Sequence, residues 1–185
     1  MTQESFTYGQ VQSALAAVHR IPAGDMGWFR GRITNFQKTG LVPASPGRGR
    51  RVAYRREDVF LWAMALEFSK WGWDPTLIKW LVHNCWAGIR PILLEASDGP
   101  DKYFYFQPNF LGRLVPKDER ESVVRAGARP SIMNVIASDF DELDKQAKTD
   151  QARATLKRFR DEHGKINLSR VRRDVEAALA EAIRA

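Results

Sequence analysis

Apolar residues recur every three or four positions along the first 40 residues, a spacing that places side chains on one face of a helix. Thr7 and Gln10 have the spacing of a capping box, which predicts that the first helix begins at Thr7. A second helix is predicted over about residues 25–38, with Gly40 as the left-handed residue after its end. The predicted buried stripes are Val11, Leu15 and Val18 on the first helix, and Met26, Phe29, Ile33 and Phe36 on the second.

The rest of the second helix is small, polar or basic. At 100° per residue, the face opposite the buried stripe consists of Gly27, Gly31, Thr34, Asn35 and Lys38, with Arg30 and Arg32 on its two flanks. Each glycine costs a surface helix about 1 kcal/mol relative to alanine. Close approach to another backbone is one reason for a helix to carry that cost.

A hairpin and two further helices are predicted next. The short strand 41–42, an arginine-rich tip and the returning strand 52–54 form the hairpin. A third helix is predicted over about residues 57–70, and it is buried because residues 59–66 are apolar almost all round. Asp74 as N-cap and Pro75 at the first helical position predict the start of a fourth helix, which turns inward Leu77, Ile78, Leu81 and Val82.

The charge is concentrated on this same stretch. The chain has 185 residues and a formal net charge of +7, from 29 Lys and Arg against 22 Asp and Glu. Nine basic residues lie between Arg20 and Arg56, where Asp25 is the one acidic residue, so the stretch carries about +8 and the remainder about −1. A field of this kind concentrates polyanions at one face, although a solvated basic loop is the alternative.

The order of elements is that of a winged helix-turn-helix. Gly-Leu-Val-Pro at 40–43, Tyr-Arg-Arg-Glu-Asp-Val at 54–59 and the segment 70–79 resemble the MerR-type pattern, over about residues 5–84. The resemblance implies a DNA-binding module whose second helix enters the major groove and whose wing contacts the flanking backbone. No long coiled-coil helix follows residue 84 directly and Cys85 stands alone, so neither the dimerisation mode nor the metal or thiol sensing of that family is carried over.

We therefore expect contacts with double-stranded DNA from the second helix and the hairpin. Arginine pairs with guanine and asparagine with adenine in the major groove, and arginines on a wing bind phosphates or enter the minor groove. The candidate residues are Arg30, Arg32, Thr34, Asn35 and Lys38 on the helix, and Arg48, Arg50, Arg51 and Tyr54 in the hairpin. Tyr54 either donates to a phosphate or packs in the hairpin. Trp28 either stacks at the interface with DNA or is buried against the first helix, and burial is the preferred expectation.

The fold class expected for the whole chain is α+β, mostly α. Residues 1–86 form the winged helix-turn-helix domain, and residues 87–185 form a mixed strand and helix region for dimerisation, an effector or a protein partner. In that region we predict strands at 89–97, 102–107 and 131–137, a helix over 138–160, and a last helix after Asn167 or Ser169. The last helix carries a narrow apolar seam that packs on its own small sheet or on a partner chain of a homodimer.

Enzymatic chemistry is not expected. The chain contains no P-loop, no G-x-S-x-G and no H-E-x-x-H motif. The three histidines show no ligand spacing and the single cysteine excludes a multi-cysteine zinc site, so no metal or other cofactor is expected. Five tryptophans between residues 62 and 86 are explained by a core of packed helices, in preference to an aromatic pocket for an effector.

Two functions remain open. The first is a sequence-specific transcriptional regulator. Its expected location is the cytoplasm, in association with the nucleoid, and no apolar run approaches the roughly 18 residues of a membrane span. The second is an architectural or assembly protein, either an excisionase-like or packaging-like DNA binder or a winged helix that binds another protein.

Overall fold

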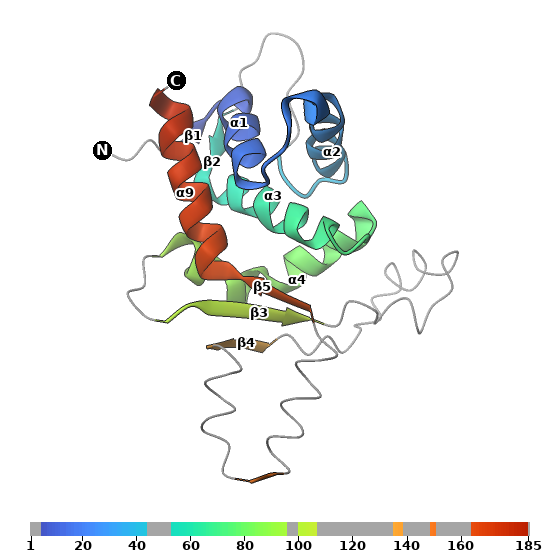
Figure 1. The fold of residues 1–185 in the computed structure, drawn as a ribbon. Helices are drawn as coiled ribbons and strands as arrows, with labels where there is room; N and C mark the ends of the chain where they lie inside the picture. Colours follow the sequence, from blue (N-terminus) through green and yellow to red (C-terminus); the bar gives the residue numbers. More distant parts are fainter. Residues whose placement is uncertain are drawn as a thin grey trace. The chain divides into compact units, whose positions relative to one another are not determined.

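A computed structural model describes residues 5–43, 53–95, 100–106, 135–138, 149–150 and 164–184. These residues are mostly helical, with two small antiparallel sheets (Figure 1). The chain forms two compact units, one of Met1–Ala96 with Arg170–Ala185 and the other of Ser97–Ser169. The α+β, mostly α class predicted from the sequence is thus confirmed.

Helix α1, Tyr8–Val18, begins where its capping box predicts. The backbone N–H of Thr7 donates to Gln10 Oε1 at 2.9 Å, and the N–H of Gln10 donates to Thr7 Oγ1 at 3.3 Å. Val11 and Leu15 are fully buried, as expected. The helix ends in a turn in which Arg20 has φ 52°, a left-handed conformation that glycine usually adopts.

Helix α2, Met26–Lys38, follows a single 3₁₀ turn, η1, at Ala23–Asp25. Of its predicted buried stripe, Phe29, Ile33 and Phe36 are buried and Met26 is half-buried. Gly40 ends the helix with φ 74°, also as predicted. The ammonium group of Lys79 donates to the carbonyl oxygen of Thr39 at 2.6 Å, so a positive charge lies at the negative end of the α2 dipole.

The hairpin expected after α2 is wrong in one of its strands. Leu41 and Val42 form a bend, because the Leu41 N–H donates to the Phe36 carbonyl at 3.1 Å and closes the helix end. The returning strand exists as β2, Tyr54–Arg55, but it pairs antiparallel with β1, Ser5–Phe6, at the start of the chain. The expected tip, with Arg48, Arg50 and Arg51, lies outside the described residues.

Helix α3, Arg56–Ser69, is the central helix of the first unit, and Figure 1 shows it beneath α1 and α2. Every side chain from Val59 to Leu66 is buried, as its apolar sequence predicts. The indole N–H of Trp62 donates to the Ile33 carbonyl at 3.3 Å, which fixes α2 on α3. The helix start is held by the Arg55 N–H, which donates to Asp58 Oδ2 at 2.8 Å.

Helix α4, Pro75–Leu94, confirms the Asp74 cap and is longer than predicted. The strand expected at 89–97 is wrong, since residues 89–94 continue α4, and the domain boundary expected after Trp86 falls inside this helix. Cys85, Ile89 and Leu93 extend the buried stripe at helical spacing. Pro91 lies inside the last turn of this helix and cannot donate a backbone hydrogen bond there.

The second unit contains a three-stranded antiparallel sheet. Strand β3, Lys102–Phe106, lies between β4, Val135–Ser138, and β5, Gly164–Asn167. The strand predicted over 102–107 is confirmed, and of the one predicted over 131–137 the structure describes residues 135–137 as part of β4, which ends at Ser138. Apart from Ser138, which belongs to β4, and residues 149–150, the helix predicted over 138–160 lies outside the described residues.

Helix α9, Leu168–Arg184, begins where the last helix was predicted, and its seam residues Val171, Val175 and Ala178 are buried. From Arg170 onward it belongs to the first unit. Arg56 forms an ion pair with Glu176 on α9, and Arg172 donates to the carbonyl oxygen of Glu95. The C-terminal helix therefore packs on the N-terminal half of the chain, which neither of the expected arrangements included.

Candidate nucleic-acid interface and adjoining pocket

The outer face of α2 is exposed, as the helical arithmetic predicts. Gly27, Gly31, Asn35 and Lys38 are exposed, and Thr34 is half-buried. Helix α2 contains no acidic residue, so every formal charge that it carries is positive. Lys38 lies in its last turn, where the helix dipole favours a cation.

No packing within the described structure requires the two glycines of this face. A Cβ atom added at Gly27 or at Gly31 would meet no atom within 4 Å. The two positions also have ordinary helical backbone, in contrast to Gly40 and Gly72, whose φ angles are positive. The glycines thus lower helix propensity without a compensating contact from the described residues.

The two flanks of this face differ. On one flank Arg30 is exposed, and Thr34 Oγ1 lies 3.5 Å from the hydroxyl of Tyr8 on α1. On the other flank the guanidinium carbon of Arg32 lies 5.8 Å from the centre of the Trp28 ring, within the range of a cation–π contact.

Trp28 is 62% exposed, so the expectation that it is buried against α1 is wrong. It precedes the buried Phe29 by one residue, and one residue is a rotation of about 100° around the helix axis. That rotation takes the indole off the buried stripe, and Arg32, one turn later, covers it instead of α1.

Tyr54 does not belong to an exposed interface. Its side chain is fully buried, and its hydroxyl accepts a hydrogen bond of 2.7 Å from Gln37 Nε2. Burial raises the pKa of this hydroxyl, and the hydrogen bond from Gln37 opposes that rise. Its ring centre lies 5.0 Å from that of Trp62. Of the two roles left open for Tyr54, packing is the one that the structure supports.

Gln37 is a structural residue that the sequence analysis missed. Besides Tyr54, its amide donates to the carbonyl oxygen of Pro43 at 3.3 Å. One buried amide therefore connects the end of α2, the segment that follows it and strand β2. A polar residue beside a buried apolar stripe was the available signal.

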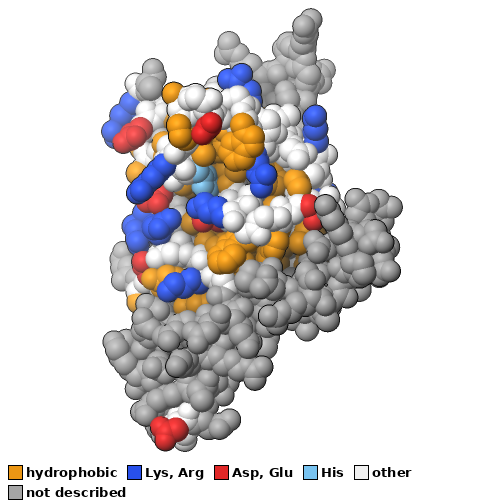
Figure 2. Space-filling view, turned by 45° about the vertical axis from the view of Figure 1, so that its right-hand side comes forward, with side chains coloured by type: hydrophobic (Ala, Val, Ile, Leu, Met, Phe, Trp, Pro, Cys, Tyr) orange, Lys and Arg blue, Asp and Glu red, His pale blue; other side chains and the backbone are white. Residues whose placement is uncertain are grey.

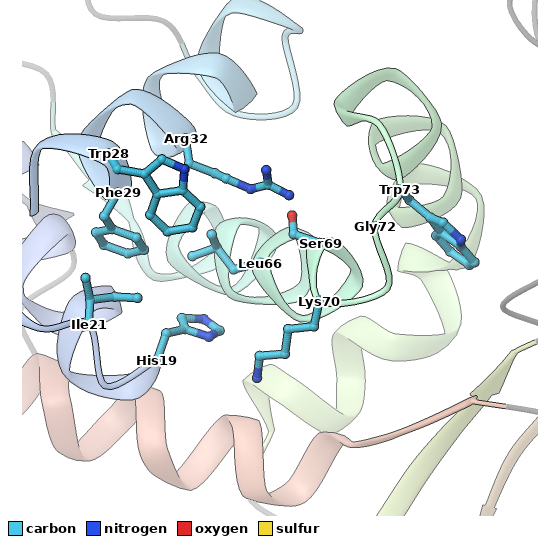
Figure 3. A pocket seen from close by; sticks show the side chains of 10 residues that line it. All are labelled: His19, Ile21, Trp28, Phe29, Arg32, Leu66, Ser69, Lys70, Gly72 and Trp73. Atoms are coloured by element: carbon cyan, nitrogen blue, oxygen red, sulfur yellow. The ribbon is translucent and has the colours of Figure 1, made fainter. Parts of the chain in front are cut away.

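A pocket of about 490 Å³ lies beside α2, between the ends of α1 and α3 (Figure 3). Its apolar lining includes Trp28 and Phe29 of α2 and Leu66 of α3. Trp73, which follows α3, also lines the pocket and stacks on Phe68 with 5.7 Å between ring centres. Figure 2 shows hydrophobic side chains at the surface interspersed with Lys and Arg side chains.

The sequence favours a packed core over an aromatic pocket for the tryptophans of residues 62–86. Trp62 does lie in the core, but Trp71 is 43% exposed and Trp73 lines the pocket. The second tryptophan of the pocket is Trp28, which was expected against the first helix. The residues that line the pocket lie up to about 50 positions apart in the sequence, and no local pattern predicts that they meet.

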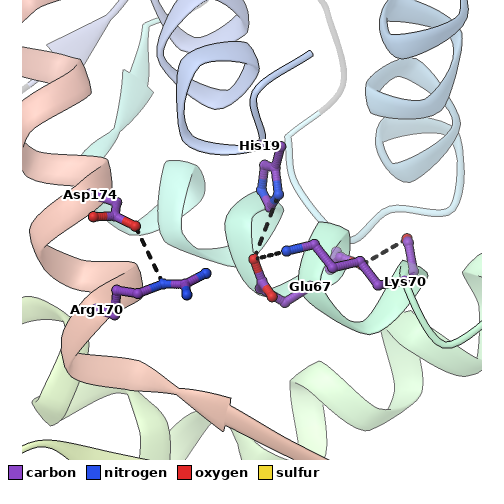
Figure 4. Close-up of polar contacts among 7 residues, drawn as sticks. His19, Glu67, Lys70, Arg170 and Asp174 are labelled. Atoms are coloured by element: carbon purple, nitrogen blue, oxygen red, sulfur yellow. Dashed lines mark hydrogen bonds and ion pairs between the residues drawn. The ribbon is translucent and has the colours of Figure 1, made fainter.

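Cationic side chains and a buried histidine complete the pocket. Arg32 and Lys70 line it, and neither Asp nor Glu does. The side chain of His19 is 5% exposed, with its Nδ1 3.6 Å from Glu67 Oε1 (Figure 4). Its other ring nitrogen, Nε2, is buried and has no hydrogen-bond partner.

The charges around His19 come from α3 and α9. Burial lowers the pKa of His19 from 6.5 to about 4, and the attraction of Glu67 opposes this shift only in part. Lys70 and Arg170 lower the pKa further. Glu67 also accepts from Lys70 Nζ at 2.6 Å, so its charge is already partly neutralised. The ring is therefore uncharged at neutral pH.

Comparison with family models, with curated proteins and with solved structures finds no match to this chain. In the described ranges, no helix has both the length and the apolarity needed to cross a membrane. Within those same ranges, no group of three or more His, Cys, Asp or Glu side chains is placed to hold a metal ion.

Proposed function

We propose that this protein binds double-stranded DNA with sequence specificity and regulates transcription. In this proposal the outer face of α2 enters the major groove, and the arginines of residues 48–51 contact the phosphate backbone as a wing. The observation that carries the proposal is the face of α2 itself. It is exposed, has no acidic residue, and contains two glycines that no contact with the described part of the chain requires.

The side chains on this face suit base and phosphate recognition. Arg30 and Asn35 are exposed and have the chemistry of bidentate contacts with guanine and adenine. Lys38 is a point charge suited to a phosphate. Thr34 and Arg32 are half-buried on the flanks and have contacts inside the fold, so we assign them smaller parts.

The winged helix-turn-helix architecture expected from the sequence is part of this proposal. Helices α1 and α2 precede the residues 44–52, and strand β2 and helix α3 follow them. The helices follow the order that the resemblance to MerR-type domains implies, whereas the strand expected at 41–42 is a bend. A homodimer on a palindromic site belongs to the same proposal, because a two-fold protein binds a two-fold site.

In vitro selection of bound duplexes from a random library, followed by footprinting, tests the proposal. A single enriched sequence supports specific recognition, and a palindromic one supports a two-fold dimer. No enriched sequence, with binding equal for all duplexes, would support the architectural alternative. No binding at about 0.1 M salt would contradict both.

Point variants then separate base contacts from phosphate contacts. Arg30→Ala and Asn35→Ala should each weaken the selected site by about 5- to 150-fold and relax specificity at one base pair. Lys38→Ala should weaken all duplexes alike and reduce the salt dependence. Arg184→Ala is the matched control, since Arg184 is an exposed cation in the last turn of α9.

A further inference from the structure

We propose that the pocket beside α2 binds a small aromatic carboxylate that also carries a hydroxyl group. Its volume of about 490 Å³ lies within the range of small-molecule sites and accommodates a molecule of one or two rings. Of the residues that line the pocket, Arg32 is the one that also belongs to the candidate DNA contacts.

The lining favours a flat apolar body. Trp28 and Phe29 from α2, Leu66 from α3 and Trp73 after it supply aromatic and aliphatic surface. Trp28 is 62% exposed without a ligand, although an indole of this size is usually more buried. A ring placed against Trp28 would cover this surface and gain the offset contacts that aromatic pairs favour.

The charges of the lining favour an acid. Arg32 and Lys70 line the pocket, and Lys70 Nζ is paired with Glu67 Oε1 at 2.6 Å, which leaves the guanidinium of Arg32 as the cation for an acid group. Figure 3 shows the Arg32 side chain extending from α2 toward Ser69 on α3, across the lining of the pocket. The guanidinium fork matches a carboxylate geometrically, which makes Arg32 the main partner for the acid group.

The buried histidine favours a hydroxyl donor on the ligand. With Nδ1 directed at Glu67, the proton of the neutral ring is assigned to Nδ1, which leaves Nε2 as an acceptor. Nε2 is buried and without a hydrogen-bond partner, and buried polar atoms are rarely left so. A ligand hydroxyl inside the pocket would supply the missing donor.

The location of the pocket couples it to the DNA-binding face. Trp28, Phe29 and Arg32 belong to α2, the helix that we propose to enter the major groove. A ligand that fixes Trp28 and Arg32 would change the freedom of this helix and therefore its affinity for DNA. This coupling rests on the proposed function, whereas ligand binding itself does not.

Direct binding to the full chain is the primary test, with no DNA present. The probes are para-hydroxybenzoate and a hydroxynaphthoate, each beside its neutral amide, and the readouts are calorimetry and a thermal shift. We expect at least one acid to bind with Kd below about 1 mM and its amide at least tenfold more weakly. Failure of every acid to bind at 1 mM, or equal affinity for acid and amide, would overturn the proposal.

Two variants locate the site. His19→Phe keeps the size of the ring and removes the unpartnered nitrogen, so it should fold and lose about tenfold in affinity for the hydroxylated acid only. Arg32→Met should abolish the preference for the acid over the amide. Trp80→Phe, on α4 outside the pocket, is the control and should change neither. Unchanged binding by both pocket variants would place the ligand elsewhere and overturn the assignment.

A DNA titration with and without the bound acid then measures the coupling. A change in affinity for the selected duplex supports the coupling. Ligand binding without any DNA binding would contradict the proposed function but not the ligand site. DNA binding without ligand binding would contradict the ligand site but not the proposed function.

Discussion

Replacing Gly31 with alanine should move stability and DNA affinity in opposite directions. Gly31 is the sixth residue of the 13-residue helix α2, and an added Cβ would meet no atom within 4 Å. The substitution therefore gains the full difference in helix propensity, about 1 kcal/mol, without strain. For a chain of 185 residues this gain should raise Tm by about 2–4 °C.

The same methyl group should weaken the complex with DNA. If the groove edge or the phosphate backbone approaches α2 to van der Waals distance at Gly31, the extra methyl forces a displacement. Inserting a methyl into a well-packed contact costs about 1–3 kcal/mol, which corresponds to a loss of about 5- to 150-fold in affinity.

The assay combines thermal unfolding with fluorescence anisotropy on the selected duplex at fixed salt. Gly27→Ala and Gly9→Ala form a matched pair, because each glycine is the second residue of its helix and both are exposed. Gly27→Ala should weaken DNA binding, and Gly9→Ala on α1 should not. A higher Tm for Gly31→Ala with unchanged DNA affinity would refute the reasoning that the glycines serve close approach.

Three further predictions concern stability. His19 has a pKa of about 4 in the folded state and about 6.5 in the unfolded state, so the unfolded chain takes up a proton first as the pH falls. Lowering the pH from 6.5 to 4 should therefore reduce the free energy of unfolding by about 3 kcal/mol. Urea titrations at several pH values should show a smaller reduction for His19→Phe. Arg20→Gly should raise the free energy of unfolding by about 0.5–1 kcal/mol, because φ 52° strains arginine more than glycine, and a lower value would contradict this. Lys79→Met should lower it by about 1.5 kcal/mol, because the Thr39 carbonyl at the end of α2 loses its charged donor; an unchanged urea midpoint would show that this cap contributes nothing.

The helix starts could be predicted because their signals are local. Thr7 and Gln10 are three residues apart and satisfy each other's backbone groups, and Asp74 binds the N–H groups that immediately follow it. The extent of α4 could not be predicted in the same way. Its segment 89–94 is a short apolar run, and such a run fits a buried strand as well as a buried helix.

Strand pairing was missed because it is not local. Strands β1 and β2 have two residues each, too few to show an alternation, and Phe6 and Tyr54 are paired across 48 positions. The burial of Tyr54 is a consequence of this pairing. The exposed face of α2, in contrast, follows from helix geometry alone, which is why its glycines, Asn35 and Lys38 lie where the sequence predicts them.

The described cations of the basic stretch do not all lie on one surface. Arg56 is paired with Glu176 of α9, and Arg32 is turned toward Trp28 and the pocket. Among the described residues of α2, Arg30 and Lys38 remain as the exposed cations of the outer face. The fold therefore divides the positive charge by role. One cation pairs with a carboxylate of α9, one lines the pocket beside α2, and two are exposed on α2. Net charge indicates a polyanionic partner, and the side-chain contacts of each cation show which of them are exposed to bind one.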